Sequence, residues 1–266
     1  MSETASAPLA PTHVACMKWG TAYGSEYVNR LYAGVRRNVT GPLRFFCMTD
    51  DPTGLDAGIE ILPLAEEPFF PAMFAEMRKH GYHGALRKLS LFRAGAVPGL
   101  SGPLLILDID VVVTGSLDDL MTWEPGKVCM RREWTTTGSR ASRGHGSVLR
   151  MDPAIHTALY DAMARDPEGE IRRYVGSEQS YTSGTAWEAG YFAPFPDQWI
   201  VSFKRACRPP RPLNLFLEPR LPRDARIVAF HGRPKIEEAM QGYTAGGLGK
   251  RVLPTRWLRK HWLGES

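Results

Sequence analysis

The sequence predicts an α/β fold, with Rossmann-like strands in a mostly parallel sheet. Short apolar runs have the length of buried strands, and segments with helical spacing lie between them. These elements alternate in the order β-α-β-β-α-β, which is typical of parallel sheets. In such sheets, ligands bind beyond the carboxyl ends of the strands, so the residues that follow each strand are the first candidates for a site.

The first strand is predicted over His13–Trp19, an apolar run that ends at the glycines of Gly20–Gly24. Apolar residues then recur at spacings of three and four over Ser25–Asn38, which predicts a helix with Ser25 as its N-cap. The next predicted elements are strands over Leu43–Thr49 and Ile59–Leu62, a helix over Ala85–Ala94 and a strand over Leu104–Leu107.

The second half of the sequence has a different character. From about Gly126 onward the strands look short, and Gly, Ser and Pro are frequent. Arg208–Pro212 cannot form a helix or a central strand, because three of its five residues are prolines. We expect a mixed lobe built on the same sheet. The predicted division is a flexible N-terminus (1–12), a single domain (13–248) with halves at 13–125 and 126–248, and a basic aromatic segment (249–266).

Composition narrows the class of protein. Four cysteines lie far apart without a CxxC pair, which favours buried free thiols in a reducing cytoplasm. No apolar stretch approaches the roughly 20 residues of a membrane span, and the N-terminus lacks the features of a secretory signal. The net charge is +5, and basic residues crowd the last third. They suit a phosphorylated ligand or an anionic membrane, whereas no RNA-binding motif or zinc-finger spacing indicates a nucleic-acid partner.

The strongest chemical signal is Asp108-Ile109-Asp110 after the strand at Leu104–Leu107. Alternate side chains of a strand point to one side, so the two carboxylates can hold a hard divalent cation together. The alternative is an edge strand with surface carboxylates, but the apolar flanks make an uncompensated pair costly. Phosphatases with an aspartyl nucleophile carry Gly or Ser and then Thr after such a pair, near the start of the chain. Here Val111 follows, at mid-chain.

From His13 to Lys235 the sequence resembles bacterial GT-A glycosyltransferases of the glycogenin and lipopolysaccharide galactosyltransferase group, family eight of the sugar transferases. The resemblance implies a metal-dependent enzyme that moves a sugar from a nucleotide-diphosphate sugar, a UDP-sugar, to a glycan or lipid-linked acceptor. It implies Mn²⁺, or Mg²⁺, as the cofactor. The alternatives are an aspartyl-type metal-dependent phosphatase and a catalytically inactive nucleotide-sugar-binding protein.

The resemblance extends to Phe230-His-Gly-Arg-Pro-Lys235. In the family, a late His followed by Gly and Lys lies beside the metal and the diphosphate. By resemblance, Asp108, Asp110 and His231 bind the metal, and Gly232 and Lys235, with Arg233, meet the diphosphate. This sequence departs from the family pattern, because fewer residues separate Gly from Lys and Ile236 follows in place of Pro-Trp.

The resemblance also assigns residues to the donor and the reacting sugar. Lys18, Trp19, Gly20 and Tyr23 take the place that binds base and ribose, with Ile109 at the motif and Asp50 at the end of the second strand. Alternatively, Trp19 and Tyr23 pack in the hydrophobic core, and Asp50 is a turn residue. Of Arg87 and Lys88, we expect Lys88 to touch the donor. His145 stands where the family has Asn, and Glu178 and Gln179 fill its Asp-Gln positions, which with Asp110 are the predicted catalytic residues. Alternatively, Glu178 is only a helix N-terminal acid.

The last segment, 249–266, combines basic residues with Trp257 and Trp262. This composition suits contact with anionic lipid at the inner face of the membrane. Packing of both tryptophans on the core is the alternative.

Overall fold

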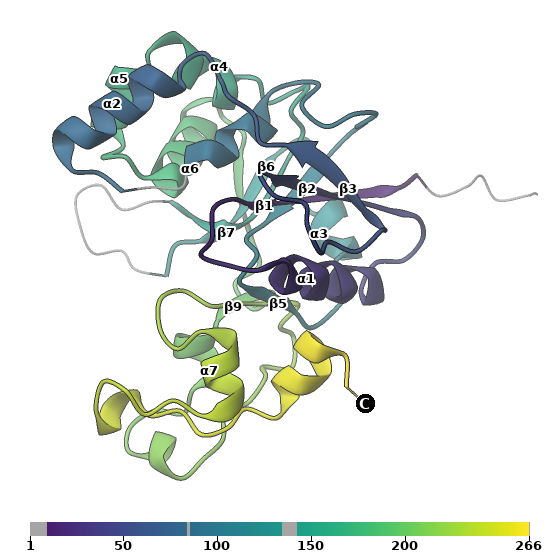
Figure 1. Ribbon diagram of the computed structural model, residues 1–266, viewed down its shortest axis with the longest axis vertical. Helices are drawn as coiled ribbons and strands as arrows, with labels where there is room; N and C mark the ends of the chain where they lie inside the picture. Colours follow the sequence, from purple (N-terminus) through teal and green to yellow (C-terminus); the bar gives the residue numbers. More distant parts are fainter. Residues whose placement is uncertain (1–9, 84–85, 135–142, 266) are drawn as a thin grey trace, which may run out of the picture.

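A computed structural model describes residues 10–83, 86–134 and 143–265 (Figure 1). The main sheet has seven strands in the order β3-β2-β1-β4-β7-β6-β8. Only β7 runs antiparallel to its neighbours, β4 and β6; the other paired strands are parallel, which confirms the predicted mostly parallel sheet. The strands are β1 (Thr12–Lys18), β2 (Leu43–Thr49), β3 (Ile59–Pro63), β4 (Leu104–Leu107), β6 (Val128–Arg132), β7 (Gly144–Met151) and β8 (Phe192–Phe195).

A second, three-stranded sheet has the order β5-β10-β9. It joins β5 (Val111–Val113), directly after the Asp-x-Asp motif, to β9 (Ile200–Ser202) and β10 (Ile227–Ala229). Strand β10 is antiparallel to β5 and parallel to β9. The expectation that the second half is built on the main sheet is therefore correct for β6, β7 and β8 and wrong for β9 and β10. Strand β10 pairs with β5, more than 100 residues earlier in the chain, and β9 joins the small sheet through β10, which no local pattern reveals.

The helices surround the two sheets. They are α1 (Ser25–Arg37), α2 (Phe70–His80), α3 (Asp118–Thr122), α4 (Ala158–Arg165), α5 (Pro167–Arg173), α6 (Glu178–Glu188) and α7 (Ile236–Gln241). Short 3-10 or π turns are η1 (Leu86–Phe92), η2 (Phe203–Cys207), η3 (Leu213–Leu215), η4 (Leu248–Lys250) and η5 (Arg259–Leu263). Figure 1 shows α1 on one side of the main sheet and α2, α4, α5 and α6 on the other.

Two local predictions were wrong. The N-cap of α1 is Gly24, in an extended conformation without a side-chain hydrogen bond, and Ser25 is already helical. The helix predicted over Ala85–Ala94 is the 3-10 helix η1, while residues 84–85 lie outside the described part of the chain. A 3-10 helix has three residues per turn, so it aligns the buried side chains of Leu86, Leu89 and Phe92 on one face. Helix α2 was not predicted.

The core has two parts, one on each side of the main sheet. Alternate residues of β1 divide between them: Val14 and Cys16 join the cluster that contains α1 and the small sheet, and Ala15 joins the cluster that contains α2 and η1. All four cysteines are buried free thiols, as predicted. In the described residues, no helix is long and apolar enough to cross a membrane.

The C-terminal segment packs on the core. The Trp262 side chain is 2% exposed in the α1 cluster, and its Nε1 donates to Glu237 Oε1 at 3.2 Å. Trp257 Nε1 donates to the Pro219 carbonyl at 3.2 Å. These contacts favour the packing alternative over lipid contact through the tryptophans. Of the predicted flexible N-terminus, residues 1–9 lie outside the described part of the chain, and Thr12 already belongs to β1.

We predict that Trp262→Ala lowers the free energy of unfolding by about 3–5 kcal/mol, because it removes a large side chain from a closed core. Denaturant unfolding followed by circular dichroism measures this change. Leu263→Ala, at the exposed neighbouring position, is the control and should cost less than about 1 kcal/mol. Equal effects of the two substitutions would show that the segment does not pack as described.

Candidate active site

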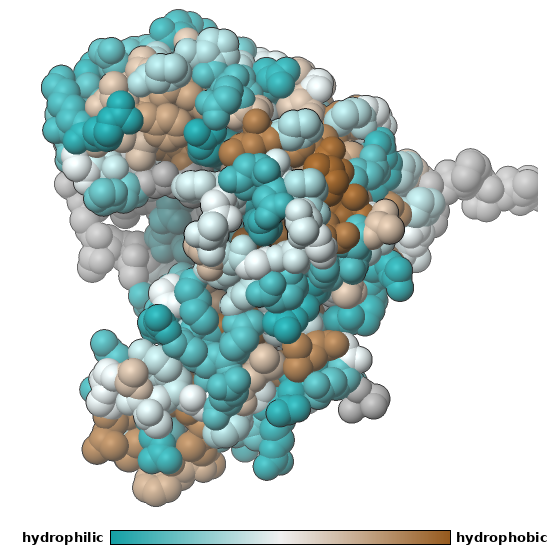
Figure 2. Space-filling model, in the orientation of Figure 1, coloured by the Kyte–Doolittle hydropathy of each residue, from teal (hydrophilic) through white to brown (hydrophobic). Residues whose placement is uncertain are grey.

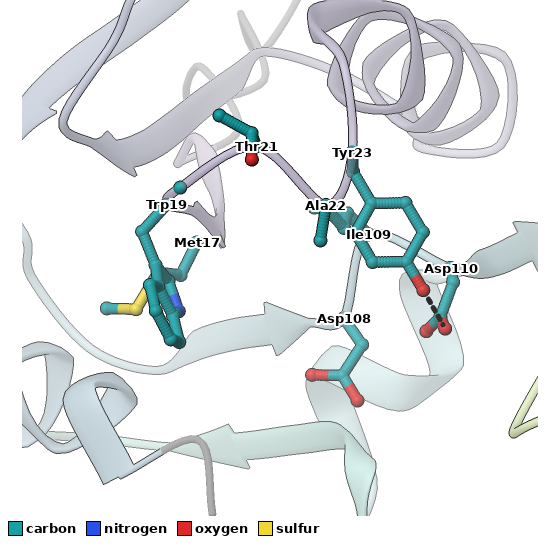
Figure 3. A pocket seen from close by; sticks show the side chains of 9 residues that line it. Met17, Trp19, Thr21, Ala22, Tyr23, Asp108, Ile109 and Asp110 are labelled. Atoms are coloured by element: carbon teal, nitrogen blue, oxygen red, sulfur yellow. Dashed lines mark hydrogen bonds between the residues drawn. The ribbon is translucent and has the colours of Figure 1, made fainter.

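A pocket of about 460 Å³ opens beyond the carboxyl ends of β1 and β4 (Figure 3). These strands are parallel neighbours in the sheet, so the residues that follow them meet at one edge. The pocket is lined by the loop after β1 and by the Asp-x-Asp motif after β4: Met17, Trp19, Gly20, Thr21, Ala22, Tyr23, Asp108, Ile109 and Asp110. The structure therefore brings together the predicted base-binding loop and the predicted metal-binding carboxylates.

A different lysine compensates each carboxylate of the motif. Lys88, from η1, donates through Nζ to Asp108 Oδ1 at 2.7 Å. Lys235, the N-cap of α7, lies with its Nζ 3.3 Å from Asp110 Oδ2. The Tyr23 hydroxyl donates to the same oxygen at 2.9 Å, which Figure 3 draws as a dashed line, and Lys235 also donates to that hydroxyl. These contacts tie three distant parts of the chain to one strand end.

The charges in this cluster interact strongly. Burial raises the pKa of Asp110, and the negative charge of Asp108 raises it further, while Lys235 and the Tyr23 hydrogen bond oppose the change. Burial alone would lower the pKa of Lys235, but its contacts with Tyr23 and Asp110 raise the pKa above the ordinary value. Both lysines are therefore protonated near neutral pH, because burial of Lys88 is likewise outweighed by the charges of Asp108 and Glu178, which raise its pKa.

Lys88 also binds the second predicted catalytic region. Its buried Nζ donates to the Gly146 carbonyl at 3.0 Å and lies 3.6 Å from Glu178 Oε2. Glu178 is the first residue of α6, and its Oε1 accepts from the Thr182 hydroxyl at 3.0 Å. Burial raises the pKa of Glu178, and Lys88 partly offsets this rise. One buried ammonium therefore holds a motif carboxylate and the predicted catalytic carboxylate together.

Gln179 is held by hydrogen bonds to Gly146 and Glu133. Its Oε1 accepts from Gly146 N at 3.3 Å, and its Nε2 donates to Glu133 Oε2 at 2.8 Å. A Cβ on Gly146 would lie 2.6 Å from Glu178 Oε2. A larger residue at position 146 would therefore displace the carboxylate of Glu178.

The small sheet brings His231 toward the motif. Ala229 of β10 is paired with Val111 of β5, and Phe230 N donates to the Asp110 carbonyl at 3.2 Å. His231 follows directly, but its Nε2 is hydrogen-bonded to Ser202 Oγ at 2.7 Å and its ring stacks on Trp134, with centroids 5.2 Å apart. Burial, assisted by the positive charge of Lys204, lowers the pKa of His231 to about 4. The imidazole is therefore neutral near pH 7.

His145, where the family has Asn, lies in the same aromatic group. Its ring centroid is 5.7 Å from that of His231 and 4.2 Å from that of Trp134. Burial lowers the pKa of His145 to about 4, so this ring is also neutral. Two neutral imidazoles and an indole thus form one wall next to the carboxylates.

The carboxylate pair fits a divalent cation. Asp108 and Asp110 face one pocket, and their mutual repulsion is what a cation would remove. The three carboxylates and two lysines described above have a net charge of −1, which a divalent ion would change to +1, suited to a diphosphate. Within residues 10–83, 86–134 and 143–265, however, no three His, Cys, Asp or Glu side chains are grouped as metal ligands. The assignment of His231 as third ligand stays a prediction.

The remaining predicted residues lie at the margin of the pocket or outside it. Lys18 does not line the pocket; its Nζ is directed to the Asp51 carbonyl at 3.4 Å. Asp50 Oδ2 accepts from Gly20 N at 3.0 Å, so it holds the loop after β1. Arg87 forms an ion pair with Glu66 at 2.8 Å, which leaves Lys88 as the basic residue of η1 at the motif.

Arg233 forms an ion pair with Glu238 of α7. Sequence reasoning missed Glu133, Trp134 and Ser202, which hold Gln179 and His231. These three residues carry no local signal, because each acts through a partner that is distant in the sequence.

No protein-family model and no curated protein sequence matches this chain. Among solved structures, it is similar to the galactosyltransferase LgtC in complex with donor and acceptor sugar analogues, with 14% identity, a TM-score of 0.54 and coverage of 85% of this chain and 89% of LgtC. It is also similar to the glycosyltransferase GlyE of Streptococcus pneumoniae (14% identity, TM-score 0.54, 90% of this chain and 58% of GlyE). A third similar structure is mouse xyloside xylosyltransferase 1, with 11% identity, a TM-score of 0.51 and coverage of 84% of this chain and 98% of the xylosyltransferase.

The chain has the GT-A fold. The match extends over most of its length, which confirms the predicted fold class and the resemblance to the LgtC group. In this GT-A chain, the pocket lies where β1 and β4 end, at the edge of the sheet that the sequence indicated.

We predict that Lys88→Met lowers the free energy of unfolding by about 3–5 kcal/mol near neutral pH, because it leaves two carboxylates without their shared cation. Without Lys88, the folded-state pKa of Glu178 stays above its unfolded value, so the folded state binds the proton more tightly. The part of the cost that comes from Glu178 is therefore absent below about pH 4.3, the ordinary pKa of Glu, and grows as pH rises from there.

Urea unfolding of the wild type and variant between about pH 5 and pH 7 measures this dependence. Arg87→Met is the matched control, because Arg87 is paired at the surface and its loss should cost about 1 kcal/mol or less at every pH. A Lys88→Met cost that does not change with pH would contradict the assigned ion pairs.

Proposed function

We propose that this chain is a metal-dependent glycosyltransferase that uses a nucleotide-diphosphate sugar, a UDP-sugar, as donor. The observation that carries the proposal is one pocket that joins an exposed aromatic and glycine loop to a pair of carboxylates at a strand end. The similarity to LgtC, GlyE and the xylosyltransferase supports glycosyl transfer as the reaction class. A glycan or a lipid-linked glycan is the proposed acceptor.

The base and ribose bind the loop after β1 in this proposal. Trp19 is 47% exposed and lines the pocket, so its ring is free to stack on a uracil. Gly20 has φ +65°, a conformation in which glycine is favoured, and no atom lies within 4 Å of the position of a Cβ. Asp50 orients this turn through the Gly20 amide. Ile109 lies between the two carboxylates and contributes to the same wall.

The diphosphate binds between the motif and the start of α7. Lys235, protonated and next to Asp110, neutralises phosphate oxygens, and the exposed Gly232 leaves its backbone open to them. Mn²⁺ or Mg²⁺, held by Asp108 and Asp110, would supply Lewis-acid neutralisation of the leaving diphosphate. Because Ser202 occupies Nε2 of His231, the imidazole would join these ligands through Nδ1, or through Nε2 after that hydrogen bond breaks.

The reacting sugar lies near Glu178 and Gln179. When the bond between the anomeric carbon and the phosphate oxygen breaks, the electron pair leaves with the diphosphate, so positive charge develops on the sugar. Glu178, held at 3.6 Å from Lys88, presents negative charge there, and Gln179 is oriented by Glu133 and Gly146 to hydrogen-bond a hydroxyl. Lys88 is a positioning residue for both Asp108 and Glu178.

We predict that Asp110→Asn weakens binding of a UDP-sugar in the presence of Mn²⁺ by at least about tenfold, because it removes half of the charge that attracts the cation. A thermal-shift titration with and without Mn²⁺ measures this loss, since ligand that binds only the folded state raises the melting temperature. Asp224→Asn, at an exposed carboxylate with no assigned contact, is the matched control and should leave the shift unchanged.

An Asp110→Asn variant that keeps both the affinity and the Mn²⁺ dependence of the wild type would sink the assignment. Release of inorganic phosphate from phosphate esters, without affinity for nucleotide sugars, would favour the phosphatase alternative. Tight binding of the UDP-sugar with no transfer or hydrolysis would favour a nucleotide-sugar-binding protein.

A separate prediction tests the base site. Trp19→Ala should weaken UDP binding by about 5- to 150-fold, because stacking of a base on an aromatic ring contributes about 1–3 kcal/mol. Isothermal titration calorimetry with UDP measures the change. Trp187→Ala, at another exposed tryptophan on α6, is the control and should bind UDP like the wild type. Equal affinity of all three proteins would place the base elsewhere.

A further inference from the structure

Exposed apolar side chains gather at the end of the molecule that carries η3 and η4. Phe216 is 74% exposed and Leu248 is 70% exposed, and Leu213 and Leu217 are exposed beside them. These four residues, here called the tip patch, are four of the nine exposed large apolar side chains in the described part of the chain. Figure 2 shows brown, apolar surface at the foot of the molecule, below the position of α7 in Figure 1. A grouping of this kind marks an interaction surface.

The tip patch is held by a fixed scaffold. Asn214 is buried, and its Nδ2 donates to the carbonyls of Leu248 and Arg251, at 3.0 Å in each case. Arg211 Nε donates to the Gly249 carbonyl at 3.0 Å. These bonds join the segments 211–217 and 248–251, which are distant in the sequence. The apolar side chains are therefore displayed on a braced surface.

Basic residues surround the tip patch without acidic partners. These basic residues are Lys204, Arg205, Arg208, Arg211, Lys250 and Arg251. None of them forms an ion pair with a carboxylate among the described residues. The nearby Glu218 is paired with Arg256. Burial and the positive charges of Arg208, Arg205 and Lys250 lower the pKa of Lys204, so these three cations lie close enough to Lys204 to act on its charge. Such a cluster attracts an anionic surface.

We propose that the tip patch docks this protein on an anionic phospholipid surface. Phe216 and the leucines would enter the boundary between head groups and acyl chains, while the flanking arginines and lysines would contact lipid phosphates. The argument for lipid is complementarity: apolar side chains ringed by cations without ion-pair partners among the described residues match a surface with an apolar interior and anionic head groups. The surface is distinct from the C-terminal tryptophans, which pack on the core.

The cation cluster also reaches the candidate active site. Lys204 Nζ lies 3.0 Å from the position that a Cβ on Gly232 would take, next to His231. Basic residues thus extend from the proposed diphosphate site to the tip patch. Docking by the tip patch does not depend on the proposed function, because it needs neither donor nor metal.

Flotation of the full chain with vesicles tests the proposal. We expect the protein to float with vesicles of phosphatidylcholine mixed with phosphatidylglycerol, and to bind vesicles of phosphatidylcholine alone at least about tenfold more weakly. Added salt should weaken the binding. The double variant Phe216→Asp/Leu248→Asp should bind the anionic vesicles at least about tenfold more weakly, and so should Arg205→Gln/Lys250→Gln, which leaves the apolar residues in place.

Ile155→Asp is the matched control, at an exposed apolar residue of the other lobe, and should bind like the wild type. Unchanged thermal melting shows that each variant folds. Absence of wild-type binding to anionic vesicles, or full binding by the Phe216→Asp/Leu248→Asp variant, would overturn the proposal. So would a wild-type dimer in light scattering that this variant dissociates, because a second copy would then be the occupant of the tip patch.

Discussion

A buried ammonium group is the constraint on which the rest of this site depends. Strand β4 is fully buried and ends in two carboxylates, and burial of negative charge at an apolar strand end is unfavourable unless a cation lies against it. Lys88 meets this need for Asp108 at 2.7 Å and also reaches Glu178. Because the Lys88 ammonium contacts both Asp108 and Glu178, it ties the 3-10 helix η1, the motif and the start of α6 together.

The small sheet brings a second lysine, Lys235, to the other carboxylate of the motif, Asp110. Strand β5 begins one residue after Asp110, and its antiparallel pairing with β10 carries the chain back toward the pocket. The turn after β10 then delivers His231, Gly232 and Lys235 to the same side. Residues more than 100 positions apart thus share one electrostatic environment. In it, lysines form ion pairs with the motif carboxylates, and binding of a divalent ion and a diphosphate would change these pairs.

The charged groups at the pocket and those around the tip patch differ in whether they form ion pairs. At the motif, Lys88 and Lys235 are each paired with a carboxylate, so a small change in bound charge alters the local field. Around the tip patch the cations have no such partners within the part of the chain that the structure describes, so their field extends into solvent. The same lobe that supplies Lys235 to the proposed donor site therefore also carries the surface proposed to meet lipid.

The sequence by itself determined the strands of the first half, the edge of the sheet where the pocket lies, and the choice of Asp108 and Asp110 as its lining. It could do so because buried strands are continuous apolar runs and because the side chains after parallel strands share an edge. It also indicated Trp19, Tyr23, Lys88 and Lys235, through resemblance. Only the tertiary structure decided that Lys18 and Arg87 face other partners, that Ser202 holds His231, and that the apolar surface belongs to η3 and η4 and not to the C-terminal tryptophans. Each of these outcomes depends on pairing between segments distant in the chain, and the free energy of such contacts is not encoded in the local pattern of either segment.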